Sequence, residues 1–174
     1  MGSGKTTISQ LLAAELGYQF IDTDAEIEKE YNATCQSIIK RYGIKDFRDK
    51  EQKLLIRLTN TEIRDTIIST GGGMSCNESN LQKMRQCGTI IYLKWTAANL
   101  TTRLMLTDLS KRPLLSNLQP SEMEQKIKND LFLRETFYSQ ADIIIDCPIN
   151  SKPCTENDDY EIAQYIVKQI KTKV

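Results

Sequence analysis

Hydrophobic and polar residues follow two alternating patterns along the chain. Short runs rich in Ile, Tyr and Phe are typical of buried strands, and longer runs with apolar residues three or four positions apart are typical of amphipathic helices. The predicted strands cover residues 18–21, 67–70, 89–93 and 142–145. The predicted helices cover residues 6–16, ended by Gly17, then 24–31, 46–59, 80–86, ended by Gly88, then 97–106, 123–139 and 159–171. Because each strand is rich in Ile, Tyr or Phe with few polar interruptions, we expect burial on both faces, and the alternation predicts an α/β fold around a parallel sheet.

The length of 174 residues suits one compact domain, so we expect a single domain over residues 1–174. The last predicted helix carries one apolar stripe, which indicates core packing and consists of Ile162, Ala163, Ile166, Val167 and Ile170. Two polar segments, residues 108–121 and 147–158, are expected to be exposed loops. Long loops beside a parallel sheet commonly carry lids and ligand contacts.

Charge and composition limit the partners and the catalytic groups that the protein can use. Lys+Arg and Asp+Glu number 23 each, so no overall field favours nucleic acid or a membrane surface as a partner. The chain has no histidine, which excludes histidine bases and zinc sites that need an imidazole. Catalysis is therefore expected to use Asp, Glu, Lys, Arg or a metal ion.

The cysteine pattern and the length of the apolar runs indicate the cellular compartment of the protein. There are five cysteines and no Cys-x-x-Cys, a pattern that favours free thiols packed as small apolar residues in a reducing environment. The longest apolar runs, near residues 89–93 and 143–145, are far too short to cross a bilayer, and the N-terminus turns polar at Thr6 and Thr7. We expect a cytoplasmic protein.

The chain begins Met1-Gly2-Ser3-Gly4-Lys5-Thr6-Thr7, which matches the C-terminal part of a P-loop followed by an amphipathic helix. In such a loop, backbone N–H groups surround phosphate oxygens at the positive end of the helix. The residues from Gly2 to Thr7 are therefore the predicted ATP-binding loop. Lys5 is expected to reach the outer phosphates, and the Thr6 hydroxyl is a candidate Mg²⁺ ligand. The alternative is a glycine-rich turn that caps an ordinary helix.

The complete P-loop pattern has another glycine five positions before Gly4 and a strand before that glycine, whereas three residues precede Gly4 here. Loss of an inner strand would cost more than the ~5–15 kcal/mol that stabilises a whole domain. We therefore expect the sequence to begin inside the loop. The gene should then hold an in-frame, strand-like segment ending in glycine just upstream.

Two carboxylates follow the first predicted strand, in Phe20-Ile21-Asp22-Thr23-Asp24. Residues two apart in an extended chain point the same way, so Asp22 and Asp24 are expected to face one cleft. One carboxylate could hold Mg²⁺, and the other could orient an acceptor hydroxyl and take its proton. The alternative is local capping, because Thr23 and Glu26 fit a capping box.

Further motifs follow in order: Phe47-Arg48-Asp49-Lys50-Glu51, then Ser69-Thr70-Gly71-Gly72-Gly73, then Arg112-Pro113-Leu114-Leu115, then Arg134 with Tyr138 one turn later. Together with the phosphate loop and Asp-Thr-Asp, this series resembles the shikimate kinase family over nearly the whole chain. The resemblance implies a P-loop NTPase-type three-layer α/β sandwich, similar to the nucleoside monophosphate kinases. It also implies a substrate-binding region near residues 25–58 and a lid near residues 109–117.

The resemblance implies ATP-dependent phosphorylation of the shikimate 3-hydroxyl on the route to chorismate, with Mg²⁺ as cofactor and a monomeric enzyme. It assigns Asp24 to the acceptor hydroxyl as candidate base, Arg48 and Arg134 to the substrate carboxylate, and Glu51 to bracing Arg48. By the same resemblance, Gly71, Gly72 and Gly73 bring the backbone to the substrate, Asp22 and Thr6 serve Mg²⁺, and Lys5 and Arg112 act on the transferring phosphoryl group. Arginine suits the carboxylate because its planar fork binds two oxygens at once.

Other interpretations remain open at this point. Arg48 with Glu51, and Asp130 with Arg134, also have the spacing of ordinary helix ion pairs, and Arg112 could be a solvated loop cation. The enzyme could be a kinase of another small hydroxy acid, such as gluconate, or a catalytically silent nucleotide- or partner-binding protein. Family members often place an arginine against adenine. Met105 falls near that position with Arg103 offset, so no adenine contact is assigned.

Overall fold

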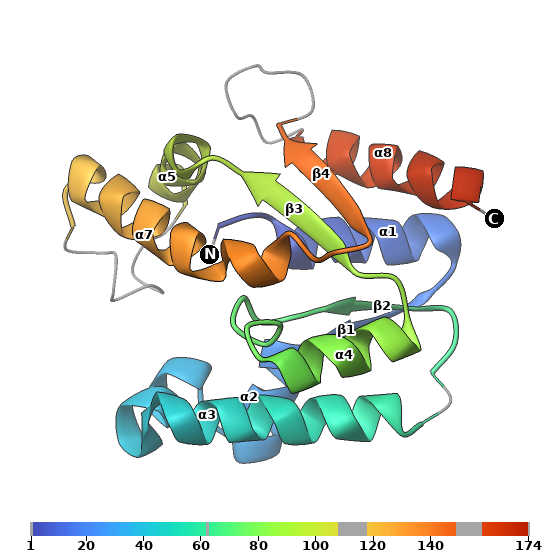
Figure 1. Ribbon diagram of the computed structural model, residues 1–174, viewed down its shortest axis with the longest axis horizontal. Helices are drawn as coiled ribbons and strands as arrows, with labels where there is room; N and C mark the ends of the chain where they lie inside the picture. Colours follow the sequence, from blue (N-terminus) through green and yellow to red (C-terminus); the bar gives the residue numbers. More distant parts are fainter. Residues whose placement is uncertain (1, 62, 108–117, 149–157, 174) are drawn as a thin grey trace. The chain divides into compact units, whose positions relative to one another are not determined.

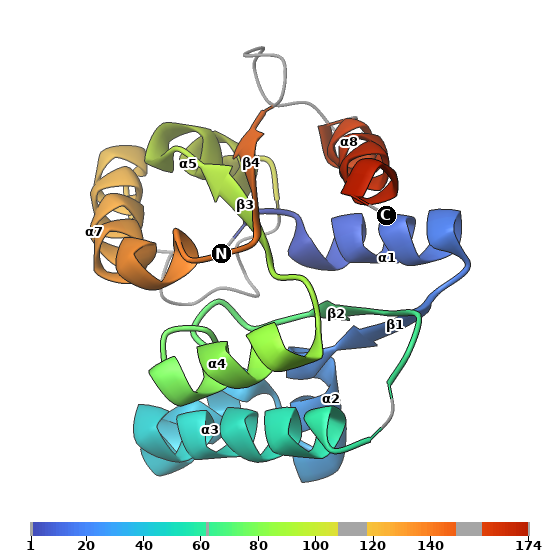
Figure 2. The ribbon, with the colours of Figure 1, turned by 45° about the vertical axis from the view of Figure 1, so that its right-hand side comes forward.

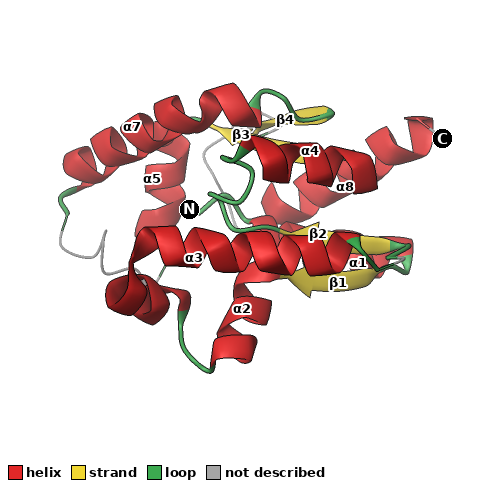
Figure 3. Cartoon of the chain, turned by 60° about the horizontal axis from the view of Figure 1, so that its bottom comes forward, coloured by secondary structure: helices red, strands yellow, loops and turns green. Residues whose placement is uncertain are grey.

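The computed structural model describes residues 2–61, 63–107, 118–148 and 158–173 (Figure 1). The chain divides into two compact units. One comprises Met1–Ile8 and Ile91–Val174 and is called the terminal unit below; the other comprises Ser9–Ile90 and is called the middle unit. Helix α1 (Lys5–Leu16) begins in the terminal unit and continues into the middle unit. Helices predominate over strands in the described residues (Figure 3).

The middle unit holds a parallel pair of strands and three helices. β1 (Gln19–Asp22) pairs with β2 (Thr66–Ser69) in parallel, so that both strands end at the same edge. The helices are α2 (Thr23–Tyr31), α3 (Cys35–Thr59) and α4 (Glu78–Cys87). α3 packs against both α2 and α4 (Figure 2). Asp22 ends β1 and Ser69 ends β2, which places the Asp-Thr-Asp and triple-glycine motifs next to each other.

An apolar cluster fixes α2 against α3. Ile27 of α2 packs with Ile38, Phe47 and Leu54 of α3, and all four are at least 95% buried. Burial of side chains of this size stabilises a fold by about 1.5–3 kcal/mol each. This cluster therefore holds α2 and α3 in a fixed relation.

The terminal unit also contains a parallel pair of strands. β3 (Ile91–Trp95) pairs with β4 (Ile143–Cys147), and the helices are α5 (Ala97–Met105), α7 (Pro120–Tyr138) and α8 (Asp158–Lys173). α5 packs against α7, and Figures 1 and 2 show α5 and α8 on opposite sides of the strand pair. The predicted stripe of α8 is core packing, since Ile162, Ala163, Ile166 and Val167 are at most 5% exposed.

Several details differ from the sequence-based expectations. α7 begins at Pro120, three residues before the predicted helix and within the expected loop, and β4 ends at Cys147, two residues after the predicted strand. α3 begins at Cys35 and not at residue 46, because Gly43 (φ 86°, ψ 164°) joins two helical pieces across a kink. β3 runs to Trp95, two residues beyond the predicted strand. Lys94 interrupts the apolar run but faces solvent, and the strand continues to the buried Trp95. Burial on both faces is wrong: β4 alternates between buried and exposed positions, and Ile144 is 42% exposed.

Most predicted helix ends are close to the observed ones. α1 ends before Gly17, which has a φ of 68°, and α4 is followed by Gly88. No helix among the described residues combines the length and the apolar character needed to cross a membrane. The described cysteines are free thiols: Cys35, Cys76, Cys87 and the buried Cys147.

Candidate active site

The phosphate-binding motif of the terminal unit forms a tight loop at the start of α1. Gly2 and Gly4 have φ values of 74° and 77°, in a backbone region that residues with a Cβ rarely adopt. The Gly4 carbonyl accepts from Ile8 N at 2.8 Å, and Lys5 Nζ lies 3.4 Å from Ser3 Oγ. Thr6 and Thr7 are exposed in the first turn of α1. The loop thus has the backbone conformation and the helix N-terminus that suit an anion.

Residues from three other elements surround this loop, and no sequence motif indicates them. Arg103 Nε of α5 donates to Gly2 O at 3.1 Å, and Trp95 Nε1 at the end of β3 donates to Ser3 O at 3.2 Å. Arg103 Nη2 pairs with Asp159 Oδ1 of α8 at 2.6 Å. Burial raises the pKa of Asp159, and the adjacent Arg103 opposes that rise. Arg103 thus contacts the phosphate loop, whereas Met105, the residue nearest the expected position, is half exposed on α5.

The Asp-Thr-Asp motif takes a different local form from the one expected. Asp22 is the N-cap of α2, and its Oδ1 accepts from Asp24 N at 3.0 Å and from Ala25 N at 3.2 Å. Thr23 is therefore not the cap, and the extended-chain argument fails for Asp24 because that residue lies in the first helical turn. A carboxylate at this position is favoured by the N–H groups and the dipole of the helix.

Thr23 instead links the two motifs of the middle unit. Its side chain is fully buried, and its hydroxyl accepts a hydrogen bond from Gly71 N at 3.0 Å. This bond joins residues 48 positions apart in the sequence. It fixes the beginning of the glycine turn beside the first turn of α2.

Asp24 and Glu51 lie against Gly71. A Cβ at Gly71 would be 2.6 Å from Asp24 Oδ1 and 2.8 Å from Glu51 Oε1, distances at which something must move. A Cβ at Gly73 would collide with the guanidinium of Arg48. A Cβ at either glycine would therefore displace charged side chains of α2 or α3 that lie against this turn.

Arg48 and Glu51 form an ion pair on α3. Arg48 Nη1 donates to Glu51 Oε2, and the Glu51 side chain is 1% exposed while that of Arg48 is 37% exposed. A buried carboxylate needs such a partner, since an unpaired buried charge is strongly destabilising. The pair is therefore more than a solvated helix pair, and it holds the guanidinium at the edge of the Asp24–glycine cluster.

Cys35 borders the same cluster. Its Sγ lies 3.6 Å from the carbonyl oxygen of Asp24. Burial, followed by the charges of Asp24 and Glu28, raises the pKa of the Cys35 thiol to about 12. The thiol is therefore neutral near pH 7 and serves as a packing group beside the carboxylates.

Arg134 is held in the terminal unit by aromatic neighbours. Its Nη1 lies 3.4 Å from Tyr138 Oη, and the Tyr138 ring lies 5.0 Å from that of Tyr92. Tyr92 Oη donates to Glu135 Oε2 at 3.2 Å, and burial together with the Glu135 charge raises the pKa of Tyr92. Asp130, the other candidate partner of Arg134, has its Oδ2 3.8 Å from Lys126 Nζ. Tyr138 therefore positions the guanidinium of Arg134.

The predicted site residues fall into two groups. The middle unit brings together Asp22, Asp24, Arg48, Glu51 and the three glycines; the terminal unit holds the phosphate loop and Arg134. The predicted convergence of Arg48 and Arg134 on one carboxylate stays a prediction. Arg112 and the predicted lid at residues 109–117 lie outside the described residues.

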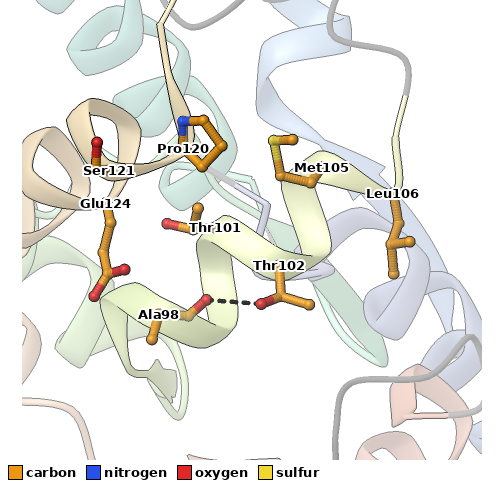
Figure 4. A pocket seen from close by; sticks show the side chains of 8 residues that line it. All are labelled: Ala98, Thr101, Thr102, Met105, Leu106, Pro120, Ser121 and Glu124. Atoms are coloured by element: carbon orange, nitrogen blue, oxygen red, sulfur yellow. Dashed lines mark hydrogen bonds between the residues drawn. The ribbon is translucent and has the colours of Figure 1, made fainter.

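An open groove of about 510 Å³ lies between α5 and the beginning of α7 (Figure 4). Its lining residues are small, apolar or uncharged apart from one carboxylate: Ala98, Thr101, Thr102, Met105, Leu106, Pro120, Ser121 and Glu124. None of the predicted site residues in the described part of the chain lines it. The groove is therefore separate from the charged clusters.

Solved structures share this architecture. A shikimate kinase from Acinetobacter baumannii in complex with shikimate superposes with a TM-score of 0.81 at 32% identity, covering 99% of this chain and 89% of that one. A shikimate kinase from Bacteroides thetaiotaomicron gives a TM-score of 0.83 at 26% identity, covering 98% and 94%. The fold is therefore the P-loop α/β fold of these kinases.

Sequence comparison agrees with the structural one. The family model described as shikimate kinase matches residues 1–171. The shikimate kinase of Azobacteroides pseudotrichonymphae is 40% identical over 144 residues, 83% of this chain and 84% of the relative. That of Parabacteroides distasonis is 36% identical over 168 residues, 97% and 94%. With the motif series and the charged cluster around the glycine turn, these matches place the chain in the shikimate kinase family of ATP-dependent phosphotransferases, which act in aromatic amino acid biosynthesis.

Proposed function

We propose that the chain transfers the γ-phosphoryl group of ATP to the 3-hydroxyl of shikimate, with the residue roles given below. The observation that carries the proposal is the cluster of the middle unit, where Asp24, Arg48 and Glu51 crowd against Gly71 and Gly73. This cluster combines a base for a hydroxyl with a cation for a carboxylate, and shikimate carries both groups. The similar structure from Acinetobacter baumannii holds shikimate, which supports the same substrate here.

Arg48 binds the substrate carboxylate, and Glu51 sets its orientation. The ion pair engages Nη1 of the guanidinium, and the planar fork has further donors for a carboxylate. Charge-assisted hydrogen bonds of this kind contribute roughly 1.5–3 kcal/mol each. Arg134, positioned by Tyr138, is the second proposed contact to the carboxylate. Gly71, Gly72 and Gly73 allow the backbone to approach the substrate closely.

Asp24 orients the acceptor hydroxyl and accepts its proton as the new bond forms. The hydroxyl oxygen attacks the γ-phosphorus of ATP, the bond from that phosphorus to the β-bridging oxygen breaks, and ADP leaves with the electron pair. Asp24 suits the role because its side chain is exposed at the start of α2 while its Oδ1 stays close to the glycine turn. Proton transfer of this kind contributes about 10²–10⁴-fold to rate.

The phosphate loop and Lys5 neutralise the phosphates of ATP. Phosphoryl transfer depends mainly on positioning and on neutralisation of the phosphate charge, so the chemistry needs no histidine. Arg112 is proposed to add a positive charge to the transferring group from the lid near residues 109–117, where closure would exclude water.

Thr6 and Asp22 are the proposed Mg²⁺ ligands. A hydroxyl and a carboxylate are hard oxygen donors, which suits Mg²⁺. The ion would supply positive charge to the β- and γ-phosphate oxygens.

The test is shikimate-dependent ADP release by the purified chain in a coupled assay. We expect release with shikimate and Mg²⁺, little release with gluconate, and loss of most turnover in Asp24→Asn with nucleotide binding retained. Release that is equal with and without shikimate, or a preference for gluconate, would contradict the proposed substrate. Nucleotide binding without any turnover would indicate a silent homologue.

We also propose that the enzyme is a cytoplasmic monomer with one kinase domain. The described helices include none able to cross a membrane. The balanced formal charge gives no overall attraction to nucleic acid or to a membrane surface. Size-exclusion chromatography with light scattering tests the monomer, for which a mass near 19.9 kDa is expected.

A further inference from the structure

Two successive carbonyl groups of the phosphate loop are held by side chains from outside it. Arg103 Nε donates to Gly2 O, and Trp95 Nε1 donates to Ser3 O. These partners are 101 and 92 residues away in the sequence, and both belong to the terminal unit, as the loop does. The loop is therefore fixed by tertiary contacts as well as by its own glycines.

The direction of these carbonyls sets the direction of the neighbouring amides. In a planar trans peptide, the C=O of one residue and the N–H of the next point in opposite directions. A Gly2 carbonyl turned toward Arg103 therefore turns Ser3 N–H the other way. A Ser3 carbonyl turned toward Trp95 does the same for Gly4 N–H. Successive N–H groups that point to one side form a site for an anion.

The guanidinium of Arg103 is itself fixed on several sides. It lies 4.6 Å from the centre of the Trp95 ring, 2.6 Å from Asp159 Oδ1 and 3.9 Å from Asp158 Oδ2. The side chains of Arg103, Asp158 and Asp159 are 13%, 11% and 15% exposed. A buried cation with this many partners has one preferred orientation, which keeps its Nε on Gly2 O.

The loop packs closely against α5 and α8. A Cβ at Gly4 would lie 2.5 Å from Asp159 Oδ1 and 3.0 Å from Arg103 Nη2, and a Cβ at Gly2 would lie 2.8 Å from Leu104 Cγ. The glycines therefore serve close packing against α5 and α8 in addition to their positive φ values.

We propose that Trp95 and Arg103 are positioning residues for nucleotide binding, which hold the Gly2 and Ser3 carbonyls so that the Ser3 and Gly4 N–H groups face the phosphates. Asp159 keeps Arg103 in place. The inference rests on the proposed use of the loop for ATP. Trp95 and Arg103 would therefore affect binding of the polyphosphate of the nucleotide and not binding of its base.

The test compares binding of MgADP and of magnesium tripolyphosphate, which lacks base and sugar, by titration calorimetry. Trp95→Phe keeps an aromatic ring beside Arg103 and removes the Nε1 donor together with part of the buried indole. Arg103→Lys keeps the charge and removes the fork that reaches both Gly2 O and Asp159. We expect each to weaken binding of both ligands by roughly 3- to 10-fold, with the shikimate KM at saturating ATP unchanged. Thr102→Val, on the same helix with a hydroxyl bonded to Ala98 O at 3.1 Å, is the matched control and should bind as the wild type does.

A purely structural role for these residues would lower the unfolding temperature and leave both dissociation constants unchanged, which would overturn the proposal. Weaker MgADP binding with unchanged tripolyphosphate binding would also overturn it, because the effect would then lie on the base. Binding by the wild type without shikimate-dependent ADP release would refute the proposed function and leave this inference standing. Failure of the wild type to bind either ligand would refute the inference directly.

Discussion

At the scale of single residues, the ion pair of α3 joins Glu51, which is buried, to Arg48, which is proposed to bind the substrate carboxylate. Glu51 is almost fully buried, whereas more than a third of the Arg48 side chain is exposed. Removing Arg48 altogether would leave a buried carboxylate without this partner, which destabilises the fold. A test of binding must therefore keep the positive charge.

Arg48→Lys meets this requirement. Lysine retains the charge but not the planar fork that can bind Glu51 and a substrate carboxylate together. We expect the shikimate KM to rise by roughly 10- to 100-fold, in line with the loss of one charge-assisted hydrogen bond, with the ATP KM nearly unchanged. Steady-state kinetics measure both constants. Arg57→Lys is the control, because Arg57 lies on the same helix and pairs with Glu30 at 2.8 Å in an exposed bridge. Equal losses for both substrates in Arg48→Lys would contradict the assigned role.

Thr23 offers a second test at this scale. Thr23→Val preserves the shape of a fully buried side chain but removes the oxygen that accepts from Gly71 N. We expect a loss of about 1–3 kcal/mol in the free energy of unfolding, because a buried N–H loses its acceptor, and a higher shikimate KM. Thr23→Ser keeps the oxygen and should restore the KM. Urea unfolding and kinetics give the two readouts, and a Val variant with wild-type KM would show that the bond serves stability alone.

At the scale of secondary structure elements, local signals predicted most of the fold. The apolar period and the glycines located α1 and α4 to within two residues, and the stripe of α8 was correctly assigned to the core. The first piece of α3 was missed because Gly43 interrupts the pattern. The signal that could have found it is its N-cap, where Thr34 Oγ1 accepts from Ser37 N at 3.1 Å.

Motifs located the charged residues of the site but not their supports. Asp24, Arg48 and the glycines belong to short sequence patterns whose residue types indicate their chemistry. Trp95, Arg103 and the Thr23 hydrogen bond act through partners 48 to 101 residues away. Only the folded chain brings such pairs together, so no local pattern in one sequence reveals them.

Gly43 gives a prediction about the kink in α3. Its φ of 86° and ψ of 164° lie in a region that is essentially restricted to glycine, although a Cβ there would meet nothing within 4 Å. We expect Gly43→Ala to lower the free energy of unfolding by about 1–3 kcal/mol through backbone strain alone. Gly88→Ala is a matched control, since Gly88 is equally open but has an extended φ of 178°. Urea denaturation measures both variants, and equal stabilities would show that the kink is not strained by a Cβ.

At the scale of the whole molecule, the two units divide the proposed chemistry. The terminal unit contains the phosphate loop, and the middle unit contains the carboxylates and Arg48. α1 crosses the division without interruption, with Ile8 in one unit and Leu12 in the other, both buried. Unfolding of either unit would therefore remove the packing of one half of a shared helix, and we expect the units to unfold together.

Thiol labelling tests this expectation, because each unit carries a described cysteine whose thiol pKa is raised by burial. Burial is the largest cause that raises the pKa of Cys35, in the middle unit, and of Cys147, in the terminal unit, from 9.0 to about 12. A thiol with this pKa has roughly a thousandfold less thiolate at pH 8 than one at 9.0, so iodoacetamide reacts after unfolding. Pulse labelling across a urea series, read by peptide mass spectrometry, should give the same midpoint for both. The exposed Cys87 should react without urea and so controls for the reagent. Separate midpoints for Cys35 and Cys147 would mean that the α1 connection does not couple the units, and that each half of the site is stable without the other.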